Sequence, residues 1–130
     1  MTITRWTIAV VDDDMRVLES IEDLLESAGH SALLFSCAEA LIEKRIIGRL
    51  DCLITDIGLP VIDGFELCQI VRTERPGLPV IFITGRHETA DQKRASDGGH
   101  QGFFRKPFDA AALLAAVSQA LLTHPRGEPS

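Results

Sequence analysis

Acidic side chains directly follow two apolar runs of this 130-residue chain, and a threonine and a lysine follow two others. These polar residues are Asp12, Asp13 and Asp14 after the first run, Asp56 after the second, Thr84 after the third and Lys106 after the last. Carboxylates brought together favour a hard divalent cation such as Mg²⁺, because two of them about 4 Å apart repel by roughly 4 kcal/mol. With a lysine and a hydroxyl nearby, an aspartate in such a site suits nucleophilic attack on phosphorus.

The apolar runs themselves predict strands of a parallel sheet. Three of them, residues 7–11, 52–55 and 80–83, are continuously apolar and do not alternate with polar residues, which is typical of strands covered on both faces. Two weaker strands are expected at 32–35 and 102–104.

Helical patterns lie between the predicted strands. An apolar stripe within residues 15–28 predicts the first helix, with Asp14 as its cap and Gly29 as its stop. Capping-box patterns at Ser36 with Glu39 and at Asp63 with Glu66 predict the next two. A short, weakly anchored helix is expected around 89–97, and a last helix, capped by Asp109, over about 110–122.

Five strand–helix repeats indicate an α/β fold of the flavodoxin-like, doubly wound type. The expected architecture is a (βα)5 unit with a five-stranded parallel sheet in the order 2-1-3-4-5 and helices on both faces. Ligands of such sheets bind at the carboxyl ends of the strands where the order reverses. That point lies between the first and third strands, so Asp12, Asp13 and Asp56 are expected to converge there, with Lys106 facing them.

Composition limits the classes of partner. The length indicates one domain, residues 1–123, followed by a polar tail or the start of a linker at 124–130. A net charge of −6 disfavours direct binding to nucleic acid. No apolar run approaches 18 residues and no leader pattern is present, so we expect no membrane contact and a cytoplasmic location. Cys37, Cys52 and Cys68 are expected to be reduced thiols.

The polar landmarks occur in a recognisable order along the chain. They are Val10-Val11-Asp12-Asp13, Asp56 with Pro60 and Gly64, Thr84-Gly85, and Lys106-Pro107-Phe108. This series, covering residues 6–122, resembles the signature of two-component response-regulator receiver domains, and parts of it are similar to the receivers of LuxR-type, FixJ-like regulators.

The resemblance implies a role for each landmark. It makes Asp56 the acceptor of a phosphoryl group from a histidine kinase in a Mg²⁺-dependent reaction. Asp13, Asp56 and the main-chain carbonyl of Gly58 would ligate the Mg²⁺, and Asp12 would act through water. Thr84 would be the switch hydroxyl, and Lys106 would pair with the phosphoryl group and precede a cis peptide bond.

The resemblance also implies a response to phosphorylation. Phe103 would change its rotamer, and the face formed by residues 89–97, the fifth strand and the last helix would switch to bind an effector or a second copy of the chain. Gly58 and Arg86 lie where the family tunes dephosphorylation. Because Gly58 has no side chain to hold water and Arg86 is long and cationic, we expect slow loss of the phosphoryl group. The chain would then catalyse only its own phosphorylation and dephosphorylation.

Two other functions compete with this interpretation. Asp12-x-Asp14 after a strand resembles the nucleophile motif of haloacid-dehalogenase-type phosphatases, with Asp12 as nucleophile, but that reading gives Asp56 no role and the chain has no room for a substrate cap. A flavodoxin-like cofactor binder would need a Ser-, Thr- or Gly-rich loop after the first strand, where three aspartates would repel a phosphate.

Overall fold

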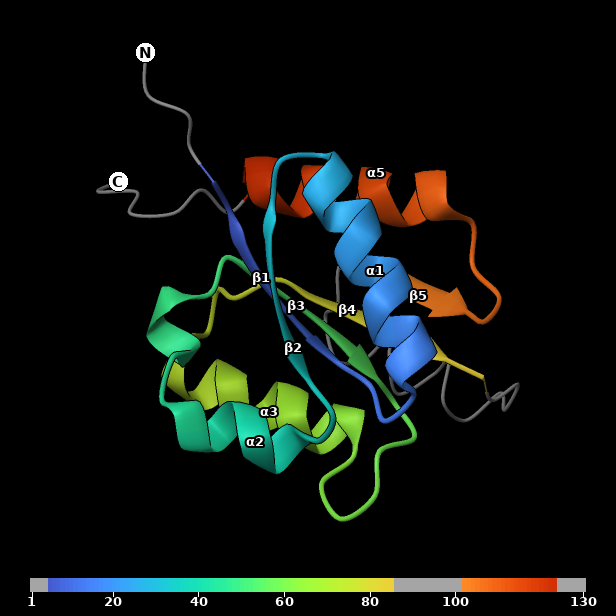
Figure 1. Cartoon of the computed structure of the whole chain (residues 1–130). Coiled ribbons are helices and arrows are strands. Elements are labelled where there is room, and N and C mark those ends of the chain that lie inside the picture. Colours follow the sequence, from blue (N-terminus) through green and yellow to red (C-terminus); the bar gives the residue numbers. More distant parts are fainter. Residues whose placement is uncertain (1–4, 86–101, 124–130) are drawn as a thin grey trace.

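Strands and helices alternate from residue 7 to residue 84 and again from residue 102 to residue 123, as the sequence predicts (Figure 1). The computed structural model describes residues 5–85 and 102–123. The strands are β1 (Thr7–Val11), β2 (Ser31–Phe35), β3 (Cys52–Asp56), β4 (Val80–Thr84) and β5 (Gly102–Arg105). The helices are α1 (Met15–Ser27), α2 (Ala38–Lys44), the 3-10 turn η1 (Ile47–Arg49), α3 (Gly64–Glu74) and α5 (Ala110–Thr123). The helix expected around 89–97 lies outside the described residues.

All five strands are parallel and lie in the order β2-β1-β3-β4-β5, which confirms the predicted topology. The register aligns Val11 of β1 with Thr55 of β3. Asp12, which follows β1, and Asp56, the last residue of β3, therefore lie side by side at the carboxyl edge of the sheet.

Alternate residues of each strand face two separate cores, one on each side of the sheet. In β1, Ala9 and Val11 pack with α2 and α3, whereas Ile8 and Val10 pack with α1 and α5. Figure 1 shows the same division, with α1 and α5 covering one face and α2 and α3 the other. Because both faces are covered, the three central strands β1, β3 and β4 are almost entirely buried, which explains the absence of alternation in their sequences.

Local capping fixes where three of the helices begin. The Asp14 side chain accepts the Arg16 N–H at 2.9 Å at the start of α1, and the Asp109 carboxylate accepts the Ala111 N–H at 2.9 Å at the start of α5. Asp63 and Glu66 form the predicted capping box of α3.

The predicted capping box of α2 is wrong. The N-cap of α2 is Cys37, in an extended conformation with φ −155° and without a side-chain hydrogen bond. The helix therefore begins one residue later than a Ser36 cap requires. Ser36 precedes the N-cap position and Glu39 is the second residue of the helix, so the two cannot form a capping box.

The far end of α3 is tied to the segment that leads into β3. The Arg75 guanidinium donates from Nη1 to the carbonyls of Ile47, Gly48 and Leu50, at 3.1, 3.1 and 3.0 Å. These carbonyls belong to the η1 turn and its exit, and the Ile47 carbonyl also accepts the Leu50 N–H at 3.2 Å. The Arg75 side chain therefore holds the segment before β3 against the C-terminal end of α3.

Candidate functional site

Three carboxylates converge at the carboxyl edge of β1 and β3. Asp12, Asp13 and Asp56 each offer an oxygen, and these oxygens lie within 4.8 Å of one another. Asp12 is fully buried, Asp56 is 7% exposed and Asp13 is exposed to solvent. Within the described ranges, this is the one group of three or more acidic, histidine or cysteine side chains that could hold a metal ion. The predicted convergence is confirmed.

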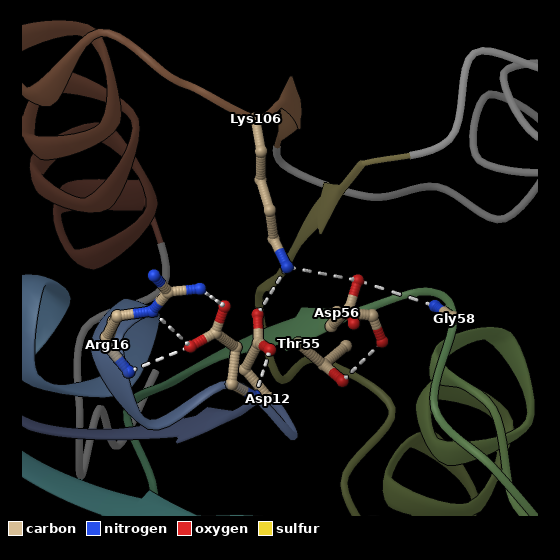
Figure 2. Close-up of polar contacts among 7 residues, drawn as sticks. Asp12, Arg16, Thr55, Asp56, Gly58 and Lys106 are labelled. Atoms are coloured by element: carbon tan, nitrogen blue, oxygen red, sulfur yellow. Dashed lines mark hydrogen bonds and ion pairs between the residues drawn. The ribbon is translucent and has the colours of Figure 1, made fainter.

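Lys106 reaches into the acidic cluster from the end of β5 (Figure 2). Its Nζ lies 2.7 Å from Asp12 Oδ2 and 3.7 Å from Asp56 Oδ1. The Lys106 main-chain N–H donates to the Thr84 carbonyl at 2.7 Å, which fixes the root of the side chain against β4. The Lys106–Pro107 peptide bond is cis, as predicted.

Main-chain donors orient the two buried carboxylates. The Asp14 N–H donates to Asp12 Oδ1 at 2.9 Å, and the Gly58 N–H lies 3.4 Å from Asp56 Oδ1. Thr55 Oγ1 donates to the Asp56 carbonyl at 3.1 Å, so it holds the backbone rather than the reactive carboxylate. The orientation of Asp12 and Asp56 is thus fixed by main-chain N–H groups two residues further along the chain.

Burial and charge act in opposite directions on the ionisable groups of the cluster. Burial raises the pKa of Asp56 and the Asp12 charge raises it further, while the Lys106 charge and the Gly58 N–H oppose them without cancelling the rise. Burial by itself would lower the pKa of Lys106, but its hydrogen bond to Asp12 and the charges of Asp56, Asp12 and Asp13 outweigh burial and raise that pKa. Lys106 is therefore a firmly charged partner for the carboxylates.

The acidic cluster fits a divalent cation. Three carboxylates share one ammonium in the cluster, and burial, followed by the charges of Asp12 and Asp13, raises the pKa of Asp56. The ligands on offer are oxygens, which hard cations prefer. Asp13 is exposed, so an ion can enter from solvent on that side. Gly58 lies two residues beyond Asp56 and is exposed, so its carbonyl is available as a further ligand.

The two predicted switch residues lie on the neighbouring strands. Thr84 ends β4 one position beyond Ile83, the residue that pairs with Asp56, and it is fully buried. Phe103 of β5 pairs with Phe82 and packs, partly buried, against the core shared with α2 and α3. Arg86 lies outside the described residues.

Two features of the site were not apparent from the sequence. Gly64 was noted as a landmark, but a Cβ there would collide with the Asp56 carbonyl and lie 2.8 Å from Ile57 Cα. The N-terminus of α3 therefore approaches the end of β3 so closely that only glycine fits. The only sequence signal for this close approach was the glycine itself. That signal is not specific, because turns and helix starts use glycine for other reasons as well.

The second feature is a groove of about 830 Å³ beside Lys106, between α1 and the segment that follows β5. Its lining residues are Asp14, Arg16, Val17, Ser20, Asp23, Leu24, Lys106, Pro107, Phe108 and Ala110. The groove joins segments some ninety positions apart, so no local sequence pattern could have revealed it.

Comparison with known proteins connects this geometry to one family. A family model described as the response regulator receiver domain matches residues 8–118. The transcriptional regulatory protein FixJ of Bradyrhizobium diazoefficiens is 30% identical over 118 residues, which are 91% of this chain and 58% of that protein. The transcriptional regulatory protein CreB of Escherichia coli is 31% identical over 117 residues, which are 90% of this chain and 51% of that protein. The chain therefore spans about half the length of the curated relatives it matches.

Solved structures agree with the sequence relatives. The BeF3-activated receiver domain of DrrB has a TM-score of 0.84 and 27% identity, covering 92% of this chain and 99% of that chain. The response regulator StyR has a TM-score of 0.83 and 36% identity, covering 93% of this chain and 61% of that chain. No described helix is both long and apolar enough to cross a lipid bilayer.

Proposed function

This chain belongs to the response regulator receiver domain family of two-component systems, and on that premise we propose that it accepts a phosphoryl group on Asp56 from a sensor histidine kinase. The observation that carries the proposal is the convergence of Asp12, Asp13 and Asp56 on one spot that Lys106 faces. The expected absence of direct nucleic-acid binding by this chain and its expected cytoplasmic location remain predictions.

The proposed reaction is a transfer between two nucleophiles. An Asp56 carboxylate oxygen attacks phosphorus, the bond from phosphorus to the histidine nitrogen breaks, and that nitrogen leaves with its electron pair. Asp56 is the acidic residue of the cluster at the end of the fully buried strand β3, and its 7% exposure leaves a path for the donor. Lys106, 3.7 Å from Asp56 Oδ1, is placed to neutralise the transferring oxygens.

We propose Mg²⁺ as the cation of the site. Asp13, Asp56 and the Gly58 carbonyl would hold it directly, and Asp12 would hold it through water. When bound, Mg²⁺ supplies positive charge to the transferring oxygens and helps to orient the phosphodonor. The chain's own residues contribute the fixed carboxylates, the Gly58 N–H that keeps Asp56 in place, and the Lys106 ammonium.

The proposed output is a change of surface. Phosphorylation adds charge close to the end of β4, where Thr84 would turn its hydroxyl toward the phosphoryl group and Phe103 would change rotamer. β5 is an edge strand next to α5, so a shift there reaches the outside of the molecule directly. The changed surface would include the helix expected around 89–97 and would bind an effector or a second copy of the chain.

The experiment that tests the proposed function is intact-protein mass spectrometry after incubation with acetyl phosphate and Mg²⁺. The wild-type chain should gain the mass of one phosphoryl group, and Asp56→Asn should gain none. Asp23→Asn, which removes an exposed carboxylate of α1, serves as the matched control and should be labelled like the wild type. A full adduct on Asp56→Asn would contradict the proposal.

The same experiment separates the phosphatase alternative, in which Asp12 is the nucleophile. In the structure Asp12 is fully buried and both of its oxygens are engaged, one by the Asp14 N–H and one by Lys106. If Asp12 were the nucleophile, Asp12→Asn would abolish the adduct and Asp56→Asn would retain it. Following the wild-type adduct over time also tests the expected slow loss of the phosphoryl group, which a half-life of seconds would contradict.

A further inference from the structure

The main-chain groups of β2 are bonded to the sheet on one side. β2 lies at one end of the strand order and pairs with β1 (Figure 1). At its start the Ser31 N–H donates to the Trp6 carbonyl at 2.8 Å, and at its end the Phe35 carbonyl accepts the Asp12 N–H at 3.1 Å. The first and last residues of β2 therefore turn their main-chain groups toward β1.

The alternation of the strand turns two other residues outward. The N–H and C=O groups of successive strand residues point to opposite edges, so Leu33 faces β1 as Ser31 does, whereas Ala32 and Leu34 face away from the sheet. In the described part of the chain, no hydrogen bond reaches the main-chain groups of Ala32 or Leu34. Two donors and two acceptors therefore stand in a row along the outer edge of β2.

This edge lacks the devices that usually protect an exposed strand. Natural edge strands commonly carry a lysine or another charge, a proline or a bulge. The sequence of β2, Ser-Ala-Leu-Leu-Phe, contains no charge and no proline, and its register with β1 runs without interruption. Leu33, between the two outward-facing residues, is 37% exposed. A short apolar strand with free main-chain groups favours pairing with another strand.

We propose that two copies of this chain associate by antiparallel pairing of β2 with β2, about a two-fold axis at Leu33. Ala32 of each copy then faces Leu34 of the other, and each of these pairs exchanges two N–H···O bonds, which satisfies all the outward groups. The two Leu33 side chains form the central pair without hydrogen bonds, with Cα atoms about 4.5 Å apart, and cover each other. A second copy is the occupant because the free groups are arranged symmetrically about Leu33, so the edge is complementary to itself.

The size and charge of the interface predict a weak association. Two five-residue strands and one exposed leucine per copy make a contact of the transient size class. Each chain carries a net charge of −6, so the copies repel at a distance and salt should strengthen the dimer by screening. We expect the dimer at about 100 µM protein and above. It needs no phosphoryl group and lies at the edge of the sheet opposite β5, so this inference does not rest on the proposed function.

The first test uses the unaltered chain. NMR measures the exchange of single amide hydrogens at protein concentrations from about 20 µM to about 1 mM, without phosphodonor. The Ala32 and Leu34 amides should exchange about threefold more slowly at the highest concentration, because the second copy then binds them. The Leu33 and Phe35 amides, already bonded to β1, should slow less. Exchange at Ala32 and Leu34 that does not depend on concentration, or that slows no more than at Leu33, would overturn the inference.

The second test removes one outward donor. Ala32→Pro deletes the outward N–H and leaves the bonds to β1 in place, and edge strands tolerate proline at such positions. Its dimer dissociation constant, from analytical ultracentrifugation, should rise at least about tenfold. Leu122→Lys, which replaces an exposed leucine of α5, is the control and should stay within about twofold of the wild type. A dimer of Ala32→Pro as tight as that of the wild type would contradict the pairing.

A cross-link tests the register even if Ala32→Pro folds poorly. The central pair, with Cα atoms about 4.5 Å apart, lies within the range of about 4.4–6.8 Å that a disulfide bridges. Leu33→Cys should therefore form a covalent dimer linked through residue 33 of both copies under mild oxidation. Peptide mapping separates this link from one through the partly exposed Cys37. Leu122→Cys is the control, and linkage through residue 33 that is no faster than linkage through residue 122 would overturn the proposed register.

Discussion

At the scale of single residues, the acidic cluster lowers the stability of the fold. Asp56 is held in a nearly buried position beside Asp12, and burial together with that neighbouring charge raises its pKa above the ordinary value of 3.8. A group that is harder to ionise in the folded than in the unfolded chain lowers stability once it is ionised. The ionised Asp56 therefore lowers the free energy of unfolding as long as no cation is bound.

The first prediction concerns this cost and its dependence on pH. Between the ordinary value of 3.8 and the raised folded pKa, the folded chain binds more protons at Asp56 than the unfolded chain, so stability falls as pH rises through that window. Without metal at about pH 7, Asp56→Asn should be more stable than the wild type, on the order of 1 kcal/mol or about 4 °C in Tm. Thermal unfolding in a chelating buffer at several pH values measures the difference.

The control for this prediction is Asp23→Asn, an exposed carboxylate of α1, which should change Tm little. The advantage of Asp56→Asn should shrink as pH approaches 3.8, since the wild-type carboxyl is then protonated in the folded chain. It should also shrink when Mg²⁺ is added, because a ligand of the folded state stabilises the wild type. Equal Tm values at about pH 7 without metal would contradict this account of the cluster.

At the scale of elements, the position of Asp56 depends on how closely α3 approaches β3. The Gly64 N–H donates to the Ile57 carbonyl at 3.0 Å, and a Cβ at Gly64 would meet backbone atoms of Asp56 and Ile57, which cannot rotate away. Gly64→Ala should therefore push α3 and Asp56 apart, costing about 2 kcal/mol and slowing phosphorylation of Asp56. Denaturant unfolding and the rate of adduct formation measure the two effects.

Gly77→Ala is the matched control, because a Cβ there has open space and nothing within 4 Å. It should leave the phosphorylation rate unchanged. A Gly64→Ala chain with the stability and rate of the wild type would show that the close approach does not position Asp56.

The loop between β3 and α3 gives a second prediction at this scale. Val61 is 85% exposed and has a φ of 67°, a left-handed conformation that β-branched residues avoid. Since its side chain has little burial to lose, Val61→Gly should stabilise the chain by about 1 kcal/mol, with Val61→Ala in between. Chemical denaturation measures the order of the three chains, and a loss of stability in Val61→Gly would contradict it.

At the scale of the whole molecule, the sheet connects the acidic cluster to an outer edge. β5 carries Lys106 at its end and has one neighbouring strand, β4, and Leu122 of the adjacent α5 is 76% exposed. Phosphorylation should therefore alter the self-association of the chain through this edge. With beryllofluoride and Mg²⁺, which mimic the phosphoryl group, light scattering should show the wild-type chain shifting from monomer toward dimer. Asp56→Asn should not shift, and an identical mass for the wild type with and without beryllofluoride would contradict dimerisation.

How far the sequence predicts this molecule depends on whether the backbone or the side-chain packing decides a feature. Strand order and the gathering of Asp12 and Asp56 follow from the path of the backbone, the Asp63–Glu66 capping box follows from local residue spacing, and all three were predicted. The preference of Lys106 for Asp12 was not predictable, because it depends on how its long side chain settles between two strand ends.

The other surprises have similar origins. The start of α2 at Ala38 depends on the extended conformation of Cys37, and the capping pattern of the sequence does not encode it. The groove beside Lys106 depends on the spacing of α1 from the segment after β5, which tertiary packing sets.

The double attachment of α3 also bears on where mechanical movement can go. Its first residue, Gly64, is seated against the end of β3, and Arg75, at its other end, grips the carbonyls that precede β3. The two ends of α3 are thus attached to the two ends of β3. Because these attachments restrain β3, we expect a structural change that begins at Asp56 to displace β4 and β5 rather than β3. Amide hydrogen exchange should accordingly be slowest in β3, whether or not the chain carries a phosphoryl group.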